Sequence, residues 1–536
     1  MSAILKVNPR VTRLINYLNE IEEGKLQIPL FQRDFVWGKK EKLELFESLK
    51  LGYPIGSLLF WKPKESFKVK EEIGPYKINK NVKDDNNFFY ILDGFQRLST
   101  LFGCLINPEK TSLEINEFDL IKEFSIFYDL ENEEFTLSRS TPTDITLIPV
   151  NTLIDTFAFL DYVERLRNSI DDLDKSTILI DKARVLSSAI LDYQLPAIEI
   201  IGGTIEDAVD IFSRINSKGS KISSDWMVSA LTYNEEDEGF RLGSLIDKLL
   251  VDLQQYNFGG LKRELILQCI QSSFGKIYFD EKINDLVKKS NFKKQTLKTL
   301  EAIKKAIQFL FEELLVIENK LLPYGNQLVF ISYFFSQVVQ PSHLQKESLK
   351  RWFWITTYSS YFTIYSLSKQ RQAFEQFKNF VDGKTNEPVF NDKPNIPFSV
   401  PDFPKTIYFG SVRAKALILY LLNYSNNFKT VNASEVEQLK IFYLFNDDRV
   451  PAGVIPLIEY IKKPLFEFDK KPEDLSFMLN ELYFSSILDK YFIEEDMIHL
   501  YYEKLNNLIL MRRYKLIVSS EMEFVRKYGL EYSELF

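Results

Sequence analysis

Residues 88–101 carry the clearest chemical signal of the chain and read Phe-Phe-Tyr-Ile-Leu-Asp-Gly-Phe-Gln-Arg-Leu-Ser-Thr-Leu. An apolar strand runs into an Asp-Gly turn, and we expect a helix to begin near Phe95. The first turn of a helix presents free backbone N–H groups at the positive end of the helix dipole, which favours phosphate binding. Arg97 adds a planar guanidinium group that matches phosphate oxygens.

Asp93 stands just before this helix and has three potential roles. It could cap the helix, hold Arg97, or bring in a divalent cation through its oxygens. The alternative for the whole segment is a capped helix with a solvated Arg97 and no ligand. The residue types leave these interpretations open.

A second polar segment lies within residues 28–37, where Gln32, Arg33 and Asp34 stand between aromatic neighbours. Pro29 keeps the residue before it out of the helical region, so an extended piece is expected. In such a setting Arg33 can bind phosphate or stack on a base. The alternative is a strand that lines the core and carries one exposed ion pair.

A third polar segment covers residues 212–225, where we expect a helix to end near Asn216 and Gly219 to turn the chain. Arg214, Asn216 and Lys218 would then line a loop able to contact a ribose, a base or a phosphate. An ordinary connection between two helices is the alternative.

Histidine and cysteine are scarce: the chain has only His343, His499, Cys104 and Cys269. A nuclease site of the HNH type needs a histidine base and further ligands near one metal, so it cannot be assembled here. Two cysteines support neither a disulfide framework nor a cysteine-rich zinc site, and we expect Cys104 to be a packed thiol. The residues therefore predict no resident metal site.

The bulk composition indicates an ordinary globular protein of several domains. The chain has 536 residues, 45% hydrophobic and 26% charged, which exceeds the usual size of one hydrophobic core. Its net charge is −8 and its pI about 5.4, so any DNA contact must be local. No apolar run of about 18 residues and no signal-peptide pattern occur, so a cytoplasmic protein without membrane contact is expected.

Strand and helix signals alternate up to about residue 235, and long amphipathic helical patterns follow. We expect an α+β domain over residues 1–235 and a mainly helical chain after it. Five prolines within 388–404 indicate a connection between two helical domains, 236–390 and 391–536. The expected elements are strands at 56–61, 88–92, 124–128 and 195–201, a helix at 39–51, a surface loop at 62–87, and helices at 297–322 and 349–380.

Four motifs follow one another in the first 235 residues: Ile28-Pro-x-x-Gln-Arg-x-x-x-Trp37, Tyr53-Pro-Ile-Gly-Ser57, Asp93-Gly-Phe-Gln-Arg97 and Phe212-x-x-Ile-Asn-x-x-Gly-x-x-Ile-Ser223. In order, spacing and residue type they resemble the N-terminal domain of GmrSD-type modification-dependent restriction proteins, a group of bacterial defence proteins. The resemblance covers roughly residues 10–235.

The resemblance implies a ParB-like, sulfiredoxin-like α+β fold whose Asp-Gly-Gln-Gln-Arg signature binds and hydrolyses a nucleoside triphosphate with Mg²⁺. Carried over by matching position, it assigns catalysis to Asp93, Gln96 and Arg97, and nucleotide binding to Gln32, Arg33, Gly94, Arg97, Arg214 and Asn216. Phe95 stands where the signature has its first glutamine. If that glutamine orients water or contacts a phosphate, its loss weakens turnover more than binding.

In family members this domain regulates a C-terminal HNH-type nuclease and takes part in recognising modified DNA. Arg351-Trp-Phe-Trp354 and residues 502–517 resemble the helical linker and the closing helices of such proteins. Asn446-Asp-Asp-Arg-Val-Pro451 stands where paired histidines are expected. The resemblance therefore implies a degenerate or repurposed nuclease domain.

These observations predict a nucleotide-binding component of an anti-phage or restriction system that senses or acts on DNA, directly or with a partner effector protein. Hydrolysis of the bound nucleoside triphosphate stays open because of Phe95. The alternative is a non-enzymatic DNA- or protein-interaction module with an inactive nucleotide pocket. Metal-dependent DNA cleavage by carboxylates alone is a third hypothesis, but no Asp…Glu-x-Lys constellation stands out.

The purified protein is expected not to cut DNA by an HNH mechanism, because His343 and His499 cannot supply both a general base and a ligand set. A cleavage assay with Mg²⁺ or Mn²⁺, run on the natural protein and on His343→Ala and His499→Ala, tests this. Metal-dependent cleavage that disappears in either folded variant would contradict the prediction.

Overall fold

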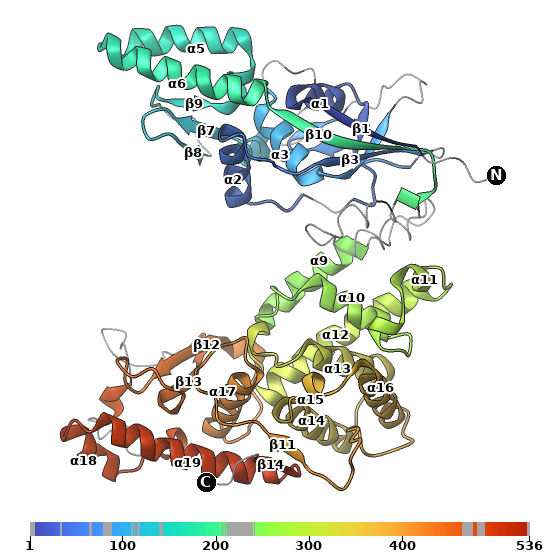
Figure 1. The fold of residues 1–536 in the computed structure, drawn as a ribbon, viewed down its shortest axis with the longest axis vertical. Helices are drawn as coiled ribbons and strands as arrows, with labels where there is room; N and C mark the ends of the chain where they lie inside the picture. The colour runs from blue at the N-terminus through green and yellow to red at the C-terminus, as the bar shows by residue number, and fades with distance from the viewer. Residues whose placement is uncertain are drawn as a thin grey trace. The chain divides into compact units, whose positions relative to one another are not determined.

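The computed structural model describes residues 6–32, 35–63, 67–78, 88–108, 111, 113–114, 118–138, 143–205, 207–208, 211, 240, 242–463, 475–479 and 488–532 (Figure 1). Contacts divide the chain into two compact units, Met1–Ser244 and Leu245–Phe536, which we call the N-terminal and C-terminal units. The N-terminal unit mixes strands with helices and the C-terminal unit is mainly helical, as predicted. A further division of the helical half near residue 390 stays a prediction.

A five-stranded sheet with the order β1-β10-β3-β6-β2 forms the centre of the N-terminal unit. β10 pairs parallel with β3 and antiparallel with β1, and β6 pairs antiparallel with β3 and parallel with β2. The strands expected at 56–61, 88–92 and 195–201 are confirmed as β3, β6 and β10. The five strands are β1 (Lys6–Arg13), β2 (Leu26–Gln27), β3 (Leu58–Lys62), β6 (Phe89–Asp93) and β10 (Gln194–Ile201).

Both faces of this sheet are buried, which explains why its central strands are almost continuously apolar. In β3, Leu58 and Phe60 belong to one hydrophobic cluster, and Leu59 and Trp61 belong to the cluster on the other face. β6 alternates in the same way, because successive side chains of a strand point to opposite faces. A shift of register by one residue would exchange the two sets.

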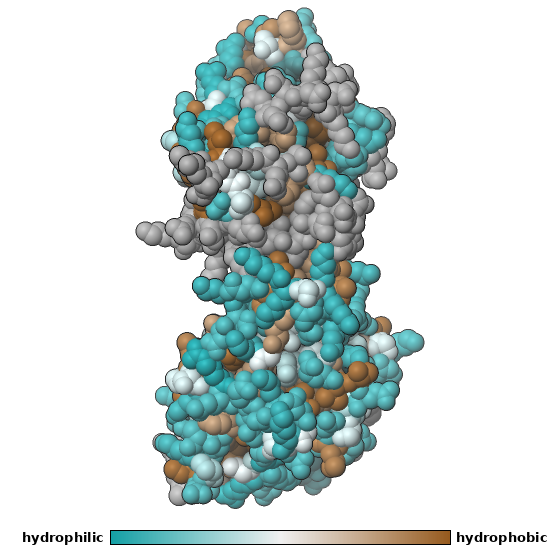
Figure 2. Space-filling model, turned by 90° about the vertical axis from the view of Figure 1, so that its right-hand side faces the viewer, coloured by the Kyte–Doolittle hydropathy of each residue, from teal (hydrophilic) through white to brown (hydrophobic). Residues whose placement is uncertain are grey.

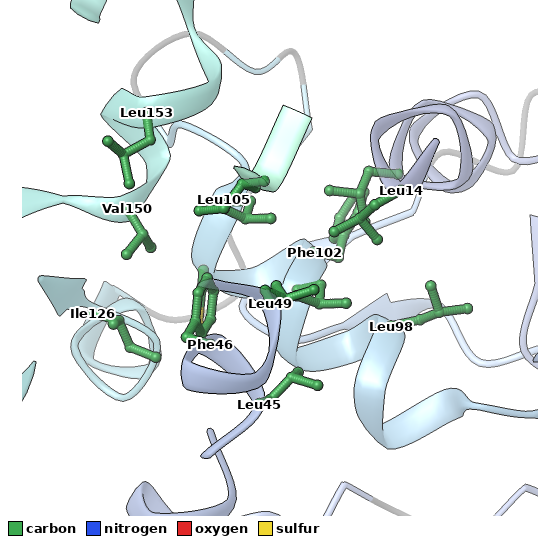
Figure 3. Close-up of a cluster of buried hydrophobic side chains, with 14 of the residues drawn as sticks. Leu14, Leu45, Phe46, Leu49, Leu98, Phe102, Leu105, Ile126, Val150 and Leu153 are labelled. Atoms are coloured by element: carbon green, nitrogen blue, oxygen red, sulfur yellow. The ribbon is translucent and has the colours of Figure 1, made fainter. Parts of the chain in front are cut away.

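Three amphipathic helices contribute to the larger cluster: α1 (Leu14–Glu22), α2 (Lys39–Lys50) and α3 (Phe95–Leu105). α2 matches the helix expected at 39–51. Figure 3 shows Phe46 of α2 and Phe102 of α3 lying among leucine side chains of the same core. Each such fully buried side chain stabilises the fold by about 1.5–3 kcal/mol, so this face holds the N-terminal unit together.

Part of the expected surface loop at 62–87 is instead a small hairpin, β4 (Glu72–Ile73) and β5 (Tyr76–Lys77). Ile73 and Tyr76 are each 1% exposed, and the Tyr76 hydroxyl donates to the Ile106 carbonyl at 2.9 Å. The many charged residues of this segment hid these two core positions. Residues 64–66 and 79–87 lie outside the described part of the chain.

A three-stranded antiparallel sheet, order β8-β7-β9, extends the same core. Its strands are β7 (Ile126–Asp129), which matches the strand expected at 124–128, β8 (Glu134–Leu137) and β9 (Leu147–Pro149). The helices α5 (Thr156–Ser169) and α6 (Leu173–Leu191) then run side by side and lead into β10 (Figure 1). The short α4 (Phe118–Lys122) and η1 (Val150–Ile154) complete the described elements of this unit.

The C-terminal unit is built mostly from helices. On the face drawn in Figure 2, its surface is mainly hydrophilic. In the parts of the chain that the structure describes, no helix is both long and apolar enough to cross a bilayer. The larger helices are α9 (Leu242–Asp252), α10 (Arg263–Ser272), α12 (Phe292–Leu314), α13 (Gly325–Gln337), α14 (His343–Tyr358), α16 (Leu367–Val381), α17 (Val412–Ser425), α18 (Asp496–Tyr502) and α19 (Asn506–Arg526), with the short α11 (Ile283–Val287) and α15 (Tyr361–Ile364) between them.

Several expectations for this unit need correction. The helix expected over 349–380 is divided into α14, α15 and α16, because Ser360 adopts the left-handed region with φ 53°. The helix expected over 297–322 ends earlier, where Leu315 also has φ 53°. The residues after 391 are not purely helical: β12 (Val436–Tyr443) and β13 (Val454–Tyr460) form an antiparallel hairpin, and β11 (Phe398–Val400) pairs with β14 (Leu530–Tyr532).

A buried ion pair joins four elements of the C-terminal unit. Arg413 of α17 donates to both oxygens of Glu521 of α19, at 2.9 and 2.6 Å, and Glu521 is 0% exposed. The hydroxyls of Tyr358 in α14 and Tyr532 in β14 also donate to this carboxylate. The Arg413 Nε–H donates to the Pro401 carbonyl at 3.0 Å. Each charge is therefore matched by partners, as a buried charge requires.

Removing one charge of this pair should be strongly destabilising. Glu521→Gln leaves Arg413 buried without a counter-ion, so we expect the free energy of unfolding to fall by about 3–5 kcal/mol. The control is Asp496→Asn, which breaks an exposed pair with Arg512 and should cost less than about 1 kcal/mol. Urea unfolding followed by circular dichroism compares the two, and equal midpoints would contradict the prediction.

Candidate functional site

The polar turn predicted from the sequence lies between β6 and α3. Gly94 is the residue before the helix and adopts φ 93°, a left-handed conformation that glycine adopts without strain. A Cβ atom there would lie 2.2 Å from a methyl of Leu58, so space also requires glycine. The helix begins at Phe95, as expected, but no side chain caps it. Asp93 is therefore not a helix cap.

The Arg97 guanidinium holds the chain entering β3. Its Nη1 donates to the Ile55 carbonyl at 2.6 Å, and its Nη2 donates to the Ser57 carbonyl at 2.9 Å and to Asp93 Oδ2 at 3.2 Å. Gly56 lies between the two carbonyls with φ 87°, and a Cβ atom there would be 2.6 Å from Nη1. Of the three roles considered for Asp93, holding Arg97 is the one the structure contains.

Tyr193 supports the same loop, residues 53–57. Its hydroxyl donates to the Tyr53 carbonyl at 2.6 Å and accepts from the Ile55 N–H at 3.2 Å. Tyr193 directly precedes β10, which lies on one side of β3. Arg97 belongs to α3, which follows β6 on the other side of β3. The loop is therefore held from both sides of β3. The loop is thus a rigid wall of the site.

Two glutamine side chains form hydrogen bonds that join Gln32 and Val36 to this turn. The Gln32 amide Nε2 donates to the carbonyls of Ile91 at 3.0 Å and Leu92 at 2.7 Å, near the end of β6. Gln96 Oε1 accepts from the Val36 N–H at 2.9 Å. Gln32 and Gln96 are each 7% exposed. The segment before Gln32 is a turn, with Gln32 N–H donating to Pro29 O at 3.0 Å, and not the extended piece that was expected.

The exposed edge of the site is acidic. Asp93 is 37% exposed and Arg97 15%, so the carboxylate is the more accessible partner of the pair. Burial lowers the pKa of Arg97, and the nearby Asp93 opposes that shift. Within the described part of the chain, Asp93 Oδ1 and the Arg97 Nε–H have no hydrogen-bond partner. One carboxylate oxygen and one cationic donor are thus available to a ligand.

Phe95 faces the core, not the solvent. It is 6% exposed and belongs to the hydrophobic cluster that α1 and α2 share. The Lys70 ammonium lies 5.3 Å from its ring centroid, a cation–π contact. Phe95 therefore contributes to packing and offers no group that could orient water.

The structure brings together a subset of the predicted site residues, namely Gln32, Asp93, Gly94, Gln96 and Arg97. Arg33, Arg214 and Asn216 lie outside the described residues, so their assignment stays a prediction. Among the residues that are described, no group of three His, Cys, Asp or Glu side chains is placed to hold a metal ion.

Sequence reasoning missed two contributors to the site. The Pro-Ile-Gly-Ser loop appeared in the motif pattern but was not assigned to the site, although a proline and a glycine two residues apart indicate a turn that other residues must hold. Tyr193 carried no signal, because nothing local distinguishes a tyrosine that bonds to a loop about 140 residues earlier.

Comparison with known proteins adds two findings. Residues 14–232 match the family described as GmrSD restriction endonuclease, N-terminal domain, a range that contains the whole polar turn. MJ0686, an uncharacterized protein of Methanocaldococcus jannaschii, is 22% identical over 444 residues, which are 75% of this chain and 74% of that protein. An alignment of this length exceeds the N-terminal unit, so the similarity continues into the C-terminal unit.

Arg97→Met should destabilise the N-terminal unit, because the Ile55 and Ser57 carbonyls lose their donor and Asp93 loses its cation. We expect a loss of about 2–4 kcal/mol in the free energy of unfolding. Arg184→Met is the matched control, since Arg184 is 63% exposed and its loss should cost less than about 0.5 kcal/mol. Urea unfolding of both variants checks this; an unchanged Arg97→Met midpoint would contradict it.

Proposed function

We propose that this chain, whose residues 14–232 match the GmrSD N-terminal domain, is a component of a restriction or defence system. We further propose that this domain binds a nucleoside triphosphate with Mg²⁺. The single observation that carries the proposal is the assembly of Gln32, Asp93 and Gln96 around the start of α3. Residues far apart in sequence meet there, and an accessible carboxylate stands beside the first turn of the helix.

Asp93 is the residue that would hold the cation. Mg²⁺ in nucleotide sites is usually bound by one or two carboxylates together with phosphate oxygens and water. A single accessible carboxylate whose Oδ1 is unpaired among the described residues suits that donor set. When bound, Mg²⁺ would offset the negative charge of the phosphates. The first turn of α3 and the Arg97 Nε–H would face the same anion.

Arg97 acts mainly as a positioning residue in this proposal, because its terminal nitrogens already bond to the protein. It sets the shape of the 53–57 loop and the orientation of Asp93. The bonds of Gln32 and Gln96 hold Gln32, just before Arg33, and Val36, after it. Phosphate contact remains the proposed role of Arg33. Arg214 and Asn216 remain proposed contacts to the ribose, base or phosphate.

The net charge of −8 disfavours DNA contact over the whole surface of the chain. The chain would therefore contact DNA through a local surface or through a partner effector protein. We retain a cytoplasmic location, a ParB-like fold for the N-terminal unit, and a C-terminal unit derived from an HNH-type nuclease as parts of the proposal.

A second candidate is a binding module that does not hydrolyse its nucleotide. The observation that favours it is the burial of Phe95. This apolar side chain, packed into the core, stands where the signature has its first glutamine. Water positioning acts mainly on the chemical step, so this replacement would impair turnover and spare affinity.

Nucleotide binding is tested by calorimetry with the four ribonucleoside triphosphates, with and without Mg²⁺ and phage DNA. Asp93→Asn keeps the shape of the side chain and leaves the Arg97 bonds to Ile55 and Ser57 in place. We expect it to weaken Mg²⁺-dependent binding at least about tenfold. Asp181→Asn, at an exposed site on α6, should bind like the natural protein. Equal affinity in folded Asp93→Asn and the natural protein would remove the proposed cation site.

The choice between turnover and binding alone is tested with Phe95→Gln. We expect faster phosphate release with little change in nucleotide affinity, together with some loss of stability because a core aromatic ring is lost. Phe95→Leu is the control, since it keeps an apolar side chain and should release phosphate at the natural rate. If neither variant nor the natural protein releases phosphate, the non-enzymatic module becomes the better description.

A further inference from the structure

An open pocket of about 470 Å³ lies at the surface of the C-terminal unit, and none of its lining residues has been assigned a role so far. Its wall comes from the start of α10, from η4 (Asn319–Leu321) with the loop that follows it, from the start of α13 and from one residue of α17. The volume lies within the range of pockets that hold small molecules, about 300–1,000 Å³. All of these elements belong to one compact unit, so the pocket is part of a single folded body.

Three lysines line this pocket: Lys262, Lys320 and Lys415, against one acidic lining residue, Glu264. Lys320 is paired with Glu318 at 3.0 Å. In the described chain Lys262 and Lys415 have no carboxylate partner, although the protein carries more acidic than basic residues overall. Two cations without a carboxylate partner therefore border the pocket, Lys262 exposed to solvent and Lys415 partly buried.

Lys415 is the more informative of the two. Its ammonium group donates to the Leu322 carbonyl at 2.8 Å, and burial alone lowers its pKa. A partly buried cation without a counter-ion costs free energy, so its presence on a cavity wall needs a compensating partner. Two of its three N–H groups have no acceptor among the described residues, and an anionic ligand would supply one.

The backbone adds to this positive character. The first turns of α10 and α13 both contribute lining residues, and Lys262 is the residue before α10, with no side chain capping that helix. Helix N-termini favour phosphate and other anions. Leu261, Leu265 and Pro323 supply apolar wall next to the lysines. A charged group and a ring or chain could thus be held side by side.

We propose that this pocket binds a small phosphorylated compound of about mononucleotide size, with its phosphate between Lys262 and Lys415. Lysine binds phosphate as a point charge, and Lys262 and Lys415 are the two lining lysines without a carboxylate partner among the described residues. The site is independent of the β6–α3 turn: it lies in the other unit and needs neither Asp93 nor Mg²⁺.

The test is calorimetry on the full chain with inorganic pyrophosphate and with ADP, in buffer containing EDTA so that Mg²⁺-dependent binding at the β6–α3 turn is suppressed. We expect Lys262→Gln and Lys415→Gln each to weaken binding about tenfold. Lys429→Gln changes an exposed lysine of the same unit and should have no effect. Asp93→Asn should also bind normally, which separates this site from the nucleotide site proposed above.

A second measurement covers the case in which Lys415→Gln does not fold. Acetylation of the natural protein with acetic anhydride, followed by mass spectrometry, should show that pyrophosphate protects Lys262 and Lys415 but not Lys429. Binding that both lysine variants retain, acetylation that the ligand does not change, or no binding by the natural protein would each overturn the proposal. Binding lost only in Asp93→Asn would overturn it too, because the ligand would then depend on the N-terminal unit and not on this pocket.

Discussion

The N-terminal unit depends on the largely buried guanidinium group of Arg97 and on the three acceptors that compensate its charge. Arg97 is 15% exposed, so its charge has to be compensated inside the protein, and its partners are two carbonyls before β3 and one carboxylate at the end of β6. These contacts fix the start of β3 against the end of β6. The position of α3, and with it the N–H groups of its first turn, follows from that constraint.

The sequence predicted this site to the extent that its signals are local. The Asp-Gly turn and the start of the helix at Phe95 depend on neighbouring residues and were placed correctly. The backbone partners of Arg97 were not, because Ile55 and Ser57 accept through carbonyl groups, which any residue type provides. Motif order indicated that residues near Gln32 and Asp93 share a function, but only the fold shows that Gln32 bonds to the end of β6.

The fold was likewise predictable only where its sequence signals are local. Central strands such as β3 and β6 were predictable because both of their faces are buried and their sequences are almost continuously apolar. The division of the 349–380 helix was not, because Ser360 adopts a left-handed conformation that its residue type does not favour. The β12–β13 hairpin was also missed; it lies in a region expected to be helical, where pairing between strands overrides a weak local preference.

The ion pair between Arg413 and Glu521 has a consequence for folding during synthesis. The two residues are 108 positions apart, so at about 5–20 residues per second the ribosome makes the carboxylate roughly 5–20 s after the cation. Until then the core around α17 cannot close without burying an unmatched charge. Arg97 differs, because all of its acceptors precede it in the chain. A nascent C-terminal unit therefore stays open longer, and this interval is when a chaperone or protease has access to it.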